Sequence, residues 1–389
     1  MHAGRTVFSQ IMDFMPRREF SRCVERYNGH YKVQTFTCQE QFRCMAFAQL
    51  TYRHSLRDIE VCLRAMGSRL YHMGIRSRIS KSTLADANER RDCRIYQDFA
   101  HHLMAAAKTM YAEEEFGIEL DATLYALDST IIDLCLTSFP WSRLNQYRGG
   151  VKLHTLLNLR GNIPDFIHIT SRPVNDVLGM DALVLEPGAF YVFDRGYYSF
   201  ARFFMINRAP AFFVTRAKKT LDVLHTKKHA VDRKTGIQWD HTIMFKTKRQ
   251  LEMYPEPLRH ITYFEPKTKK MVVFLTNNFD LPAVVIADIY KARWQIELFF
   301  RWIKQHLRIK NFFGTSENAV KTQIWIAVAT YVLVAILKKQ YEVEHSLYKI
   351  LQVMSVTLFE KVPVEQLLRD LDRYPEKSAV SNQLKLWQL

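Results

Sequence analysis

Cysteine is sparse in this chain of 389 residues, and its distribution excludes two kinds of stabilised fold. The six cysteines include no CxxC pair, and all of them lie before residue 136. This pattern indicates neither a zinc site nor a disulfide framework, so we expect reduced thiols in a helical core. Glycine and proline are also scarce, at 13 and 12 residues, which argues against a long flexible linker.

Acidic residues are the second shortage. Asp and Glu number 39 against 55 Lys and Arg, which gives a formal net charge of +16 and a pI of about 9.5. This balance favours a polyanionic partner, either nucleic acid or an anionic membrane surface.

The sequence also lacks a long apolar run. The longest, 324-IWIAVATYVLVAIL-337, is shorter than the roughly 20 residues that cross a bilayer, so it predicts a buried core helix. The start, MHAGRTVFSQIMDFM, lacks the basic region, apolar core and cleavage site of a signal peptide. We therefore expect a cytoplasmic protein without membrane partners.

What the sequence does contain is a one-sided polar stripe on an apolar helix, in 290-YKARWQIELFFRWIK-304. At about 100° per residue, its four polar members fall within roughly a 60° arc. They are Tyr290, Arg293, Glu297 and Lys304. A salt-bridged helix face would explain the stripe on its own. An acid flanked by an arginine, a lysine and a phenol also suits a metal ligand whose neighbours bind phosphates.

Two aspartates occupy matching positions on strand-like runs. Asp128 lies inside 123-TLYALDSTIIDL-134, and Asp194 ends the strand in 189-AFYVFDRGYYSF-200. Each alone is compatible with an ordinary strand-end or turn aspartate. Together with Glu297 they form a cluster of three carboxylates, which repel one another unless divalent cations lie between them. That layout is typical of a two-metal phosphodiester-cleaving site.

These motifs resemble those of a known family. The Y-x2-R-x3-E-x6-K signature from Tyr290 to Lys304, the DST at Asp128 and the DRGY at Asp194 resemble bacterial insertion-sequence transposases of the DDE class. The resemblance implies an RNase H-like core, two Mg²⁺ ions for which Mn²⁺ can substitute, and cut-and-paste transposition through a DNA hairpin. It also implies transposon-end and target DNA as partners, and a homodimer in the synaptic complex.

The expected elements from about residue 118 onward match the β-β-β-α-β-α-β order of an RNase H-like sheet. They are strand 123–134, strand 151–159, strand 163–170, helix 174–185, strand 190–194, helix 198–207 and strand 211–215. The predicted fold class is α/β, with an RNase H-like catalytic domain over 116–345 that contains a β-rich insertion at about 216–275. An all-α DNA-binding domain, 1–115, precedes it, and a helical tail, 346–389, follows.

The N-terminal part contains a predicted helix-turn-helix at about 55–92. Helix 55-SLRDIEVCLRAMG-67 and helix 82-STLADANERRD-92 are joined by the basic segment 76–80. The second helix would enter a major groove, which makes Arg90 and Arg91 candidate DNA contacts. Helix pairs of this kind are also common in cores that bind no DNA.

Two further residues are candidate DNA contacts. Arg195, beside Asp194, is placed to reach a phosphate. Trp239 would stack on an unpaired base, as an insertion-domain aromatic does in the resembled family, although a strand Trp covering a small core is the simpler interpretation.

Two other functions compete with a transposase. A DNA-binding protein derived from a transposase, without catalytic activity, would explain the charge but not three acids in register with the signature. A carbohydrate hydrolase would use paired carboxylates but would not call for a net charge of +16.

Overall fold

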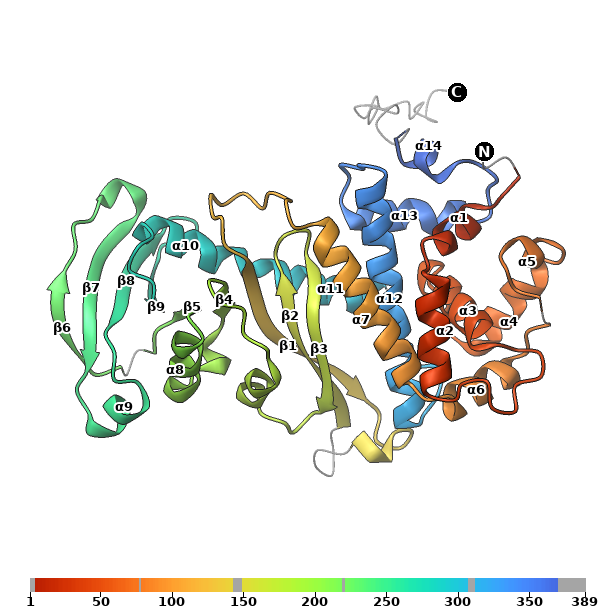
Figure 1. Cartoon of the computed structure of the whole chain (residues 1–389), viewed down its shortest axis with the longest axis horizontal. Coiled ribbons are helices and arrows are strands. Elements are labelled where there is room, and N and C mark those ends of the chain that lie inside the picture. Colours follow the sequence, from red (N-terminus) through yellow and green to blue (C-terminus); the bar gives the residue numbers. More distant parts are fainter. Residues whose placement is uncertain (1–3, 77, 143–148, 219–220, 307–311, 370–389) are drawn as a thin grey trace, which may run out of the picture.

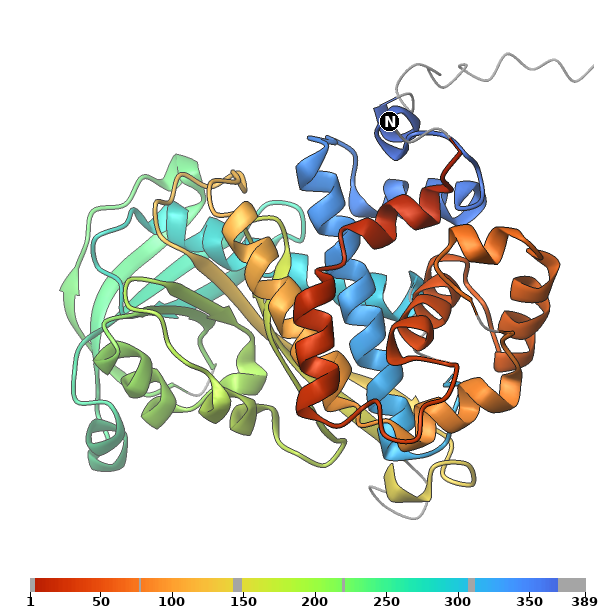
Figure 2. The same cartoon turned by 45° about the vertical axis from the view of Figure 1, so that its right-hand side comes forward.

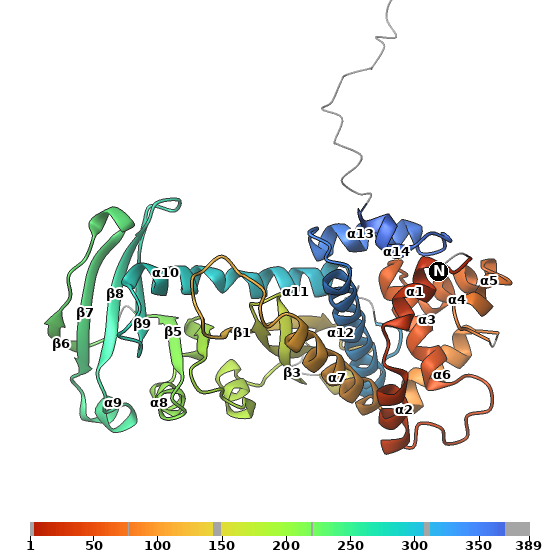
Figure 3. The same cartoon turned by 45° about the horizontal axis from the view of Figure 1, so that its top comes forward.

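The computed structural model describes residues 4–76, 78–142, 149–218, 221–306 and 312–369 as an elongated molecule (Figure 1). A sheet extends along the long axis, and helices from the two ends of the chain gather beyond one end of it (Figures 1 and 3). The predicted fold class, an α/β core with helices before and after it, is confirmed.

Within the described residues, nine strands form one sheet in the order β3-β2-β1-β4-β5-β9-β8-β7-β6. The core half consists of an antiparallel β1–β2–β3 hairpin pair, with β4 and β5 added in parallel to β1. These strands are β1 (Leu124–Leu134), β2 (Gly149–Asn158), β3 (Ile163–Ser171), β4 (Phe190–Phe193) and β5 (Phe212–Arg216). All five predicted core strands are present, with bounds within two residues, because their apolar, β-branched runs are buried.

One predicted helix is wrong. Instead of an α-helix over 174–185, the chain forms a short 3₁₀ helix, η2 (Asp176–Ala182). The side chain of Asn175 accepts a hydrogen bond from the Val177 N–H, which favours a turn. Gly179 then packs so closely on His154 that a Cβ would lie 2.8 Å from the imidazole. The following helix, α8 (Phe200–Arg208), agrees with its prediction.

The β-rich segment at about 216–275 continues the core sheet, because β9 pairs antiparallel with β5. A buried ion pair between Arg259 and Asp240, 2.6 Å apart, links two of its strands. Its elements are β6 (Val223–Lys228), β7 (Ile237–Phe245), α9 (Lys248–Met253), β8 (Leu258–Glu265) and β9 (Lys270–Thr276). The helix α10 (Ala283–Ala292) then packs on this part of the sheet, where the rings of Tyr290 and Phe274 are 5.0 Å apart.

Two long helices join the sheet to the helical end. α7 (Arg94–Met110) and α12 (Glu317–Gln340) lie side by side next to β3 (Figure 1). By length and composition α12 would be able to cross a membrane, but 94% of its most apolar window is buried in the protein. The expected core helix at 324–337 is therefore confirmed. The remaining N-terminal helices are α1 (Val7–Asp13), α2 (Arg17–Arg26), α3 (Cys38–Leu50), α4 (Leu56–Ala65), α5 (Arg69–His72) and α6 (Lys81–Arg90).

The start of the chain is bonded to its C-terminal helices, α13 (Leu347–Thr357) and α14 (Val364–Arg369) (Figure 2). The Val7 N–H donates to the Glu360 carbonyl, and the Gln10 amide bonds the backbone at Val362 and Val364. The apolar core consequently runs without a break from the N-terminal helices into α13 and α14. The last part of the expected tail, 370–389, lies outside the described residues.

The predicted helix-turn-helix differs from the structure in its connection. α4 and α6 are both present, but the short helix α5 and two glycines with positive φ, Gly67 and Gly74, lie between them. Residues 66–80 are thus a longer link than the roughly three- or four-residue turn of that motif. The periodicity of the two helices was predicted correctly, whereas the glycine turns were overlooked.

Asn318, near the start of α12, anchors the turn between α6 and α7. Its amide donates to the carbonyls of Asn88 and Arg91, and its oxygen accepts from the Cys93 N–H. We expect Asn318→Ala to lower the free energy of unfolding by about 1–3 kcal/mol, because these peptide groups lose their partners. The neighbouring Glu317→Ala should change it by less than about 0.5 kcal/mol. Urea unfolding checks this, and equal effects would mean that water replaces the lost bonds.

Candidate active site

Asp128 and Asp194 lie side by side near the centre of the sheet. Asp128 is on β1, and Asp194 directly follows β4, the parallel neighbour of β1. The register pairs Leu127 with Phe193, so the two aspartates come next on adjacent strands. Because successive side chains alternate between faces, both carboxylates leave the sheet on the face opposite Leu127 and Phe193.

Backbone N–H groups orient both aspartates. The Ser129 N–H donates to Asp128 Oδ1, and the Gly196 N–H donates to Asp194 Oδ1, each at 2.7 Å. A Cβ on Gly196 would lie 2.9 Å from that same Asp194 oxygen, so a larger residue there would displace the Asp194 carboxylate. The DRG sequence therefore fixes the Asp194 side chain through its own turn.

Glu297 reaches the aspartates from the helix α11 (Trp294–His306), which packs on β1. The predicted single helix is interrupted at Arg293, between the end of α10 and the start of α11. The two helices nevertheless follow one line across the sheet (Figure 3). The interruption places Tyr290 on α10, whereas Glu297 and Lys304 are on α11.

Arg293 joins the helix to the strand. Its Nη2 is 2.7 Å from Glu297 Oε1, and its Nη1 is 3.4 Å from Asp128 Oδ2. The guanidinium also lies 5.7 Å from the centre of the Tyr290 ring. The Arg293 side chain is only 16% exposed, so these contacts are made largely out of water. An arginine thus compensates two of the three acids.

The protonation of Asp128 is unusual for a carboxyl group. Burial raises its pKa from 3.8 to about 6, and the nearby charges of Asp194 and Glu297 act in the same direction. The Ser129 N–H and Arg293 oppose this rise but do not cancel it. The environment of Asp128 therefore favours a bound proton, or another positive charge close to the carboxylate.

Lys304 belongs to the same site. A hollow of about 360 Å³ is lined by Asp128, Glu297 and Lys304, together with Ser129, Thr130, Phe300 and Arg301. Both hydroxyl side chains come from the DST motif, and the others come from α11. The structure therefore brings Asp128 together with Glu297 and Lys304, the two signature residues on α11.

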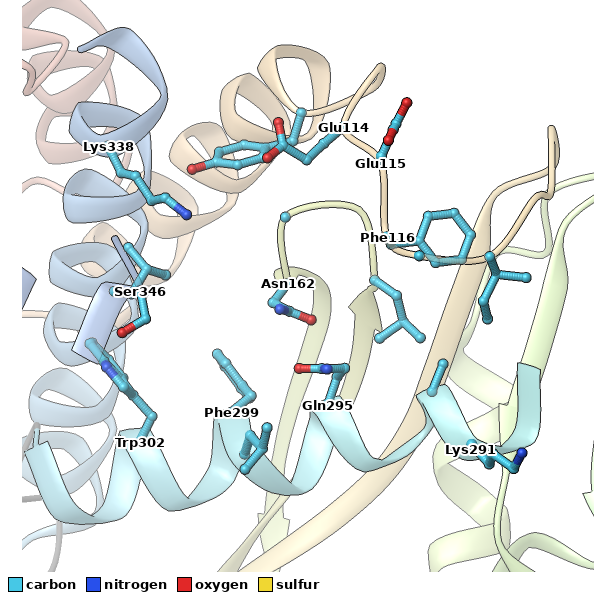
Figure 4. A pocket seen from close by; sticks show the side chains of 18 of the residues that line it. Glu114, Glu115, Phe116, Asn162, Lys291, Gln295, Phe299, Trp302, Lys338 and Ser346 are labelled. Atoms are coloured by element: carbon cyan, nitrogen blue, oxygen red, sulfur yellow. The ribbon is translucent and has the colours of Figure 1, made fainter. Parts of the chain in front are cut away.

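A larger cavity, of about 800 Å³, lies on the other side of α11 (Figure 4). Its lining includes Gln295, Phe299 and Trp302 of α11 and Lys338 of α12. These α11 residues lie on a different face of the helix from Glu297. None of the three predicted acids lines the cavity. The cavity is therefore separate from the acidic site.

The three acids offer the oxygen donors that Mg²⁺ and Mn²⁺ bind. In the part of the chain that the structure describes, no three acidic, histidine or cysteine side chains stand close enough to hold an ion as they are placed. The guanidinium of Arg293 lies between Asp128 and Glu297 instead. The donor set fits a divalent cation in charge and type, provided that Arg293 turns away.

Comparison with known proteins establishes the family. A model described as "Transposase DDE domain" matches residues 119–333, which is more than half of the chain and contains all three acids. This chain belongs to the DDE transposase family. A second model, "Domain of unknown function (DUF4372)", matches residues 3–76.

Named relatives agree with this assignment to the transposases. "Putative transposase y4zB" of Sinorhizobium fredii is 32% identical over 290 residues, 74% of this chain and 79% of that protein. "Probable transposase for insertion sequence element IS5377" of Geobacillus stearothermophilus is 32% identical over 219 residues, 54% of this chain and 55% of that protein. The resemblance to insertion-sequence transposases is confirmed.

One solved structure is similar over most of this transposase. It is a cryo-EM structure of the piggyBac transposase synaptic complex with hairpin DNA, which shares 11% sequence identity. The similarity covers 95% of this chain and 82% of that one at a TM-score of 0.45, which is too low to bear on details of the fold.

Two of the transposase's predicted DNA contacts lie on the sheet beyond Asp194. Arg195 lines a hollow of about 700 Å³ whose other members include Arg216, Lys218, Lys269 and Lys270. The side chain of Trp239, on β7, is 42% exposed, and the cationic groups of Lys228 and Arg233 lie 5.1 and 5.7 Å from its ring centre. Arg195 directly follows Asp194 in the chain, and both Arg195 and Trp239 stay predicted DNA contacts.

The predicted contacts at the end of α6 are placed differently from one another. Arg90 is exposed. Arg91 is turned inward, where it donates to Gln41 Oε1 and the Phe36 carbonyl and lies over the Phe36 ring. The inward contacts of Arg91 serve the packing of α6 against α3, so only Arg90 is free to meet a partner from this position.

A supporting group beside Asp128 could not be predicted from the sequence. The Ser129 hydroxyl donates to Asp176 Oδ1 at 2.6 Å, and the buried Lys152 ammonium is 3.0 Å from the same oxygen. Lys152 and Asp128 are on adjacent strands, and Asp176 begins η2. In the sequence, only the serine of the DST motif pointed to this group. Asp176 is 47 residues away in the chain, so no local pattern connects it with Ser129.

The pKa of Asp128 predicts how stability depends on pH. Its pKa is higher in the folded chain than the ordinary 3.8, so its stabilising contribution is present at low pH and is lost as the pH rises through about 6. In EDTA at pH 8, Asp128→Asn should therefore raise the free energy of unfolding, by at most about 3 kcal/mol. The difference should vanish below pH 4.

Urea unfolding between pH 4 and pH 8 measures this effect. Asp133→Asn is the control, because that side chain is on the same strand but is 79% exposed. A less stable Asp128→Asn protein at pH 8 would mean that the contacts with Ser129 and Arg293 outweigh the cost of burial.

Proposed function

We propose that this chain binds the terminal inverted repeats of its insertion sequence, cleaves DNA at those ends and joins them to target DNA. One observation carries the proposal. Asp194 directly follows the strand that pairs with the strand of Asp128, and Arg293 links Asp128 to Glu297, so Asp128 has two acids from distant parts of the sequence near it. Membership of the transposase family supports the same activity.

Asp128, Asp194 and Glu297 would hold two Mg²⁺ ions, for which Mn²⁺ can substitute. Such ions, when bound, lower the pKa of an attacking water or 3′-hydroxyl and stabilise the charge on the leaving oxygen. Asp128 gains most from a nearby cation, because burial and two carboxylates raise its pKa. The backbone N–H bonds to Asp128 and Asp194 keep both side chains oriented for this role.

The signature residues around Glu297 would bind DNA phosphates. Arg293 forms a planar fork that suits a phosphate as well as a carboxylate, whereas Lys304 offers a single charge at the edge of the hollow. We expect Arg293 to leave Asp128 for a phosphate when cations and DNA arrive together. Tyr290 packs under the guanidinium and would guide that movement.

The sheet beyond Asp194 would bind the DNA next to the cleavage point. Arg195 and the lysines around its hollow provide phosphate contacts. The exposed ring of Trp239 provides a surface on which an unpaired base can stack. A hairpin intermediate would present such bases at the cleaved end.

Transposition requires both ends of the element in one complex, so we propose a homodimer bound to end DNA and target DNA. The chain would act in the bacterial cytoplasm, where the DNA is. Test duplexes are taken from the DNA that flanks the gene, where terminal inverted repeats are expected.

The first functional prediction concerns cleavage. Asp128→Asn, Asp194→Asn and Glu297→Gln should each reduce Mg²⁺-dependent cutting of an end duplex by at least about 100-fold, because each removes a negative charge from the metal-holding set. DNA binding should survive. Asp133→Asn on the exposed side of β1 is the control and should cut normally.

Gel analysis of labelled duplexes measures the cutting rate. A variant of the three acids that cuts at the normal rate removes that residue from the site. A normal chain that binds the duplex and never cuts it would favour the alternative, a DNA-binding protein without catalytic activity.

The second functional prediction concerns the signature helix. Arg293→Ala and Lys304→Ala should each reduce the slope of log affinity against log salt by about one unit for cleaved-end DNA, since each phosphate contact releases about one counterion. Lys291→Ala is the control, because Lys291 lines the cavity on the other side. Anisotropy titrations from low to high NaCl give the slopes. Unchanged slopes for both variants would identify the stripe as a salt-bridged helix face.

A further inference from the structure

Positive charge gathers a second time, far from the acids, in the N-terminal helices. Residues 53–81 contain seven Lys and Arg but only two acids, Asp58 and Glu60. About half of this segment forms α4 and α5, at the end of the molecule opposite β6 (Figure 1). The matched family model over 3–76 is a domain of unknown function, so the charge has no assigned purpose.

α4 turns one basic stripe outward. Ile59 and Leu63 are buried, whereas Arg57, Val61 and Arg64 are exposed at a spacing of four and three residues. Val61 lies between these two arginines and is 59% exposed. A short helix with arginines on either side of an exposed methyl pair suits base edges, including the thymine methyl, in a major groove.

A hollow of about 330 Å³ opens beside this stripe, between the end of α4, α5 and the segment after it. Arg64, Arg76 and Arg78 line it together with Tyr71, and none of the described residues that line it is acidic. The Tyr71 side chain is 68% exposed. Three arginines around one opening repel each other unless an anion lies between them.

The charged groups near the hollow have partners within the chain, and one of them, Glu60, partly offsets the charge of Arg64. The carboxylate of Asp58 accepts a hydrogen bond from the His54 N–H and pairs with Arg53. Its contacts are therefore with residues at the start of α4. Glu60 is paired with Arg64. Beneath the hollow, Arg43 donates to the Gly74 carbonyl; burial, followed by the charges of other arginines, lowers the pKa of Arg43.

α6, the helix expected to read DNA, has a less suitable surface. Its exposed residues include Asp86 and Glu89 as well as Lys81 and Arg90, so its outward charge is mixed. Its C-terminal end is fastened to α12 by Asn318. Carboxylates on a groove-facing helix would repel the phosphates on either side.

We propose that the face formed by α4, α5 and the hollow between them is a binding surface for duplex DNA, in which α4 enters a groove and the hollow holds a backbone phosphate. This inference rests on the proposed function for the identity of the DNA. It assigns binding to the domain that matches residues 3–76, and it moves the contact from α6 to α4.

The test uses the full chain and two fluorescent duplexes, one from the flanking inverted repeat and one of scrambled sequence. In the variant R64A/R76A/R78A, affinity for both duplexes should fall at least about tenfold at moderate salt, and the salt slope should shrink by roughly one unit, because the hollow holds one phosphate. The control R18A/R22A/R208A removes the same charge from other exposed positions and should bind like the unaltered chain.

A lysine variant separates electrostatics from folding. R64K/R76K/R78K keeps the charge, so the slope should return while affinity stays below that of the arginine form, because lysine cannot make a two-pronged contact. Separately, Val61→Asp should abolish the preference for the repeat over the scrambled duplex, because it introduces an acid where a base edge would lie.

Four results would overturn the assignment. Normal affinity and slope in the R64A/R76A/R78A variant would exclude the hollow, as would an equal loss in the control. A loss of repeat preference in Arg90→Ala but not in Val61→Asp would return the contact to α6. If the unaltered chain binds neither duplex, the proposed function fails, and the surface assignment fails with it.

Discussion

The structure depends on how negative charge is tolerated inside the sheet. Asp128 lies in a buried strand, next to Asp194 and below Glu297, and the cost of that placement appears as a pKa raised to about 6. Arg293 is the compensating group in the chain alone, because its guanidinium contacts both Asp128 and Glu297. In the proposed function, the site is kept assembled by this arginine until divalent cations and DNA phosphates together displace it.

The rest of the fold fixes these few groups in place. Parallel pairing of β1 with β4 sets the two aspartates side by side, and the α10–α11 line carries Arg293 and Glu297 across the same face. Behind α11, α12 is buried almost completely and connects the site to the N-terminal helices through Asn318. The proposed DNA-binding surface and the three acids therefore stand on one continuous apolar core, although they lie in different parts of the molecule.

The sequence predicted what local chemistry determines. Buried β-branched runs located the five core strands, and the spacing from Tyr290 to Lys304 placed the polar stripe together with Glu297. The sequence did not predict the long-range contacts, because no local spacing of residues indicates them. Asp176 reaches Ser129 from another segment, Arg91 turns inward onto Phe36, and α1 is bonded to the chain near Val362. Both helices of the predicted helix-turn-helix are present, but the sequence did not predict the link between them, where Gly67 and Gly74 have positive φ.

The most direct test is to locate divalent cations in the assembled complex. Crystals of the chain bound to an end duplex in Mn²⁺ would be measured at a wavelength where manganese scatters anomalously. The account predicts anomalous peaks bounded by Asp128, Asp194 and Glu297, with the Arg293 guanidinium moved from Asp128 to a DNA phosphate. Bound DNA with Arg293 still between Asp128 and Glu297, and with no peak at the three acids, would contradict it.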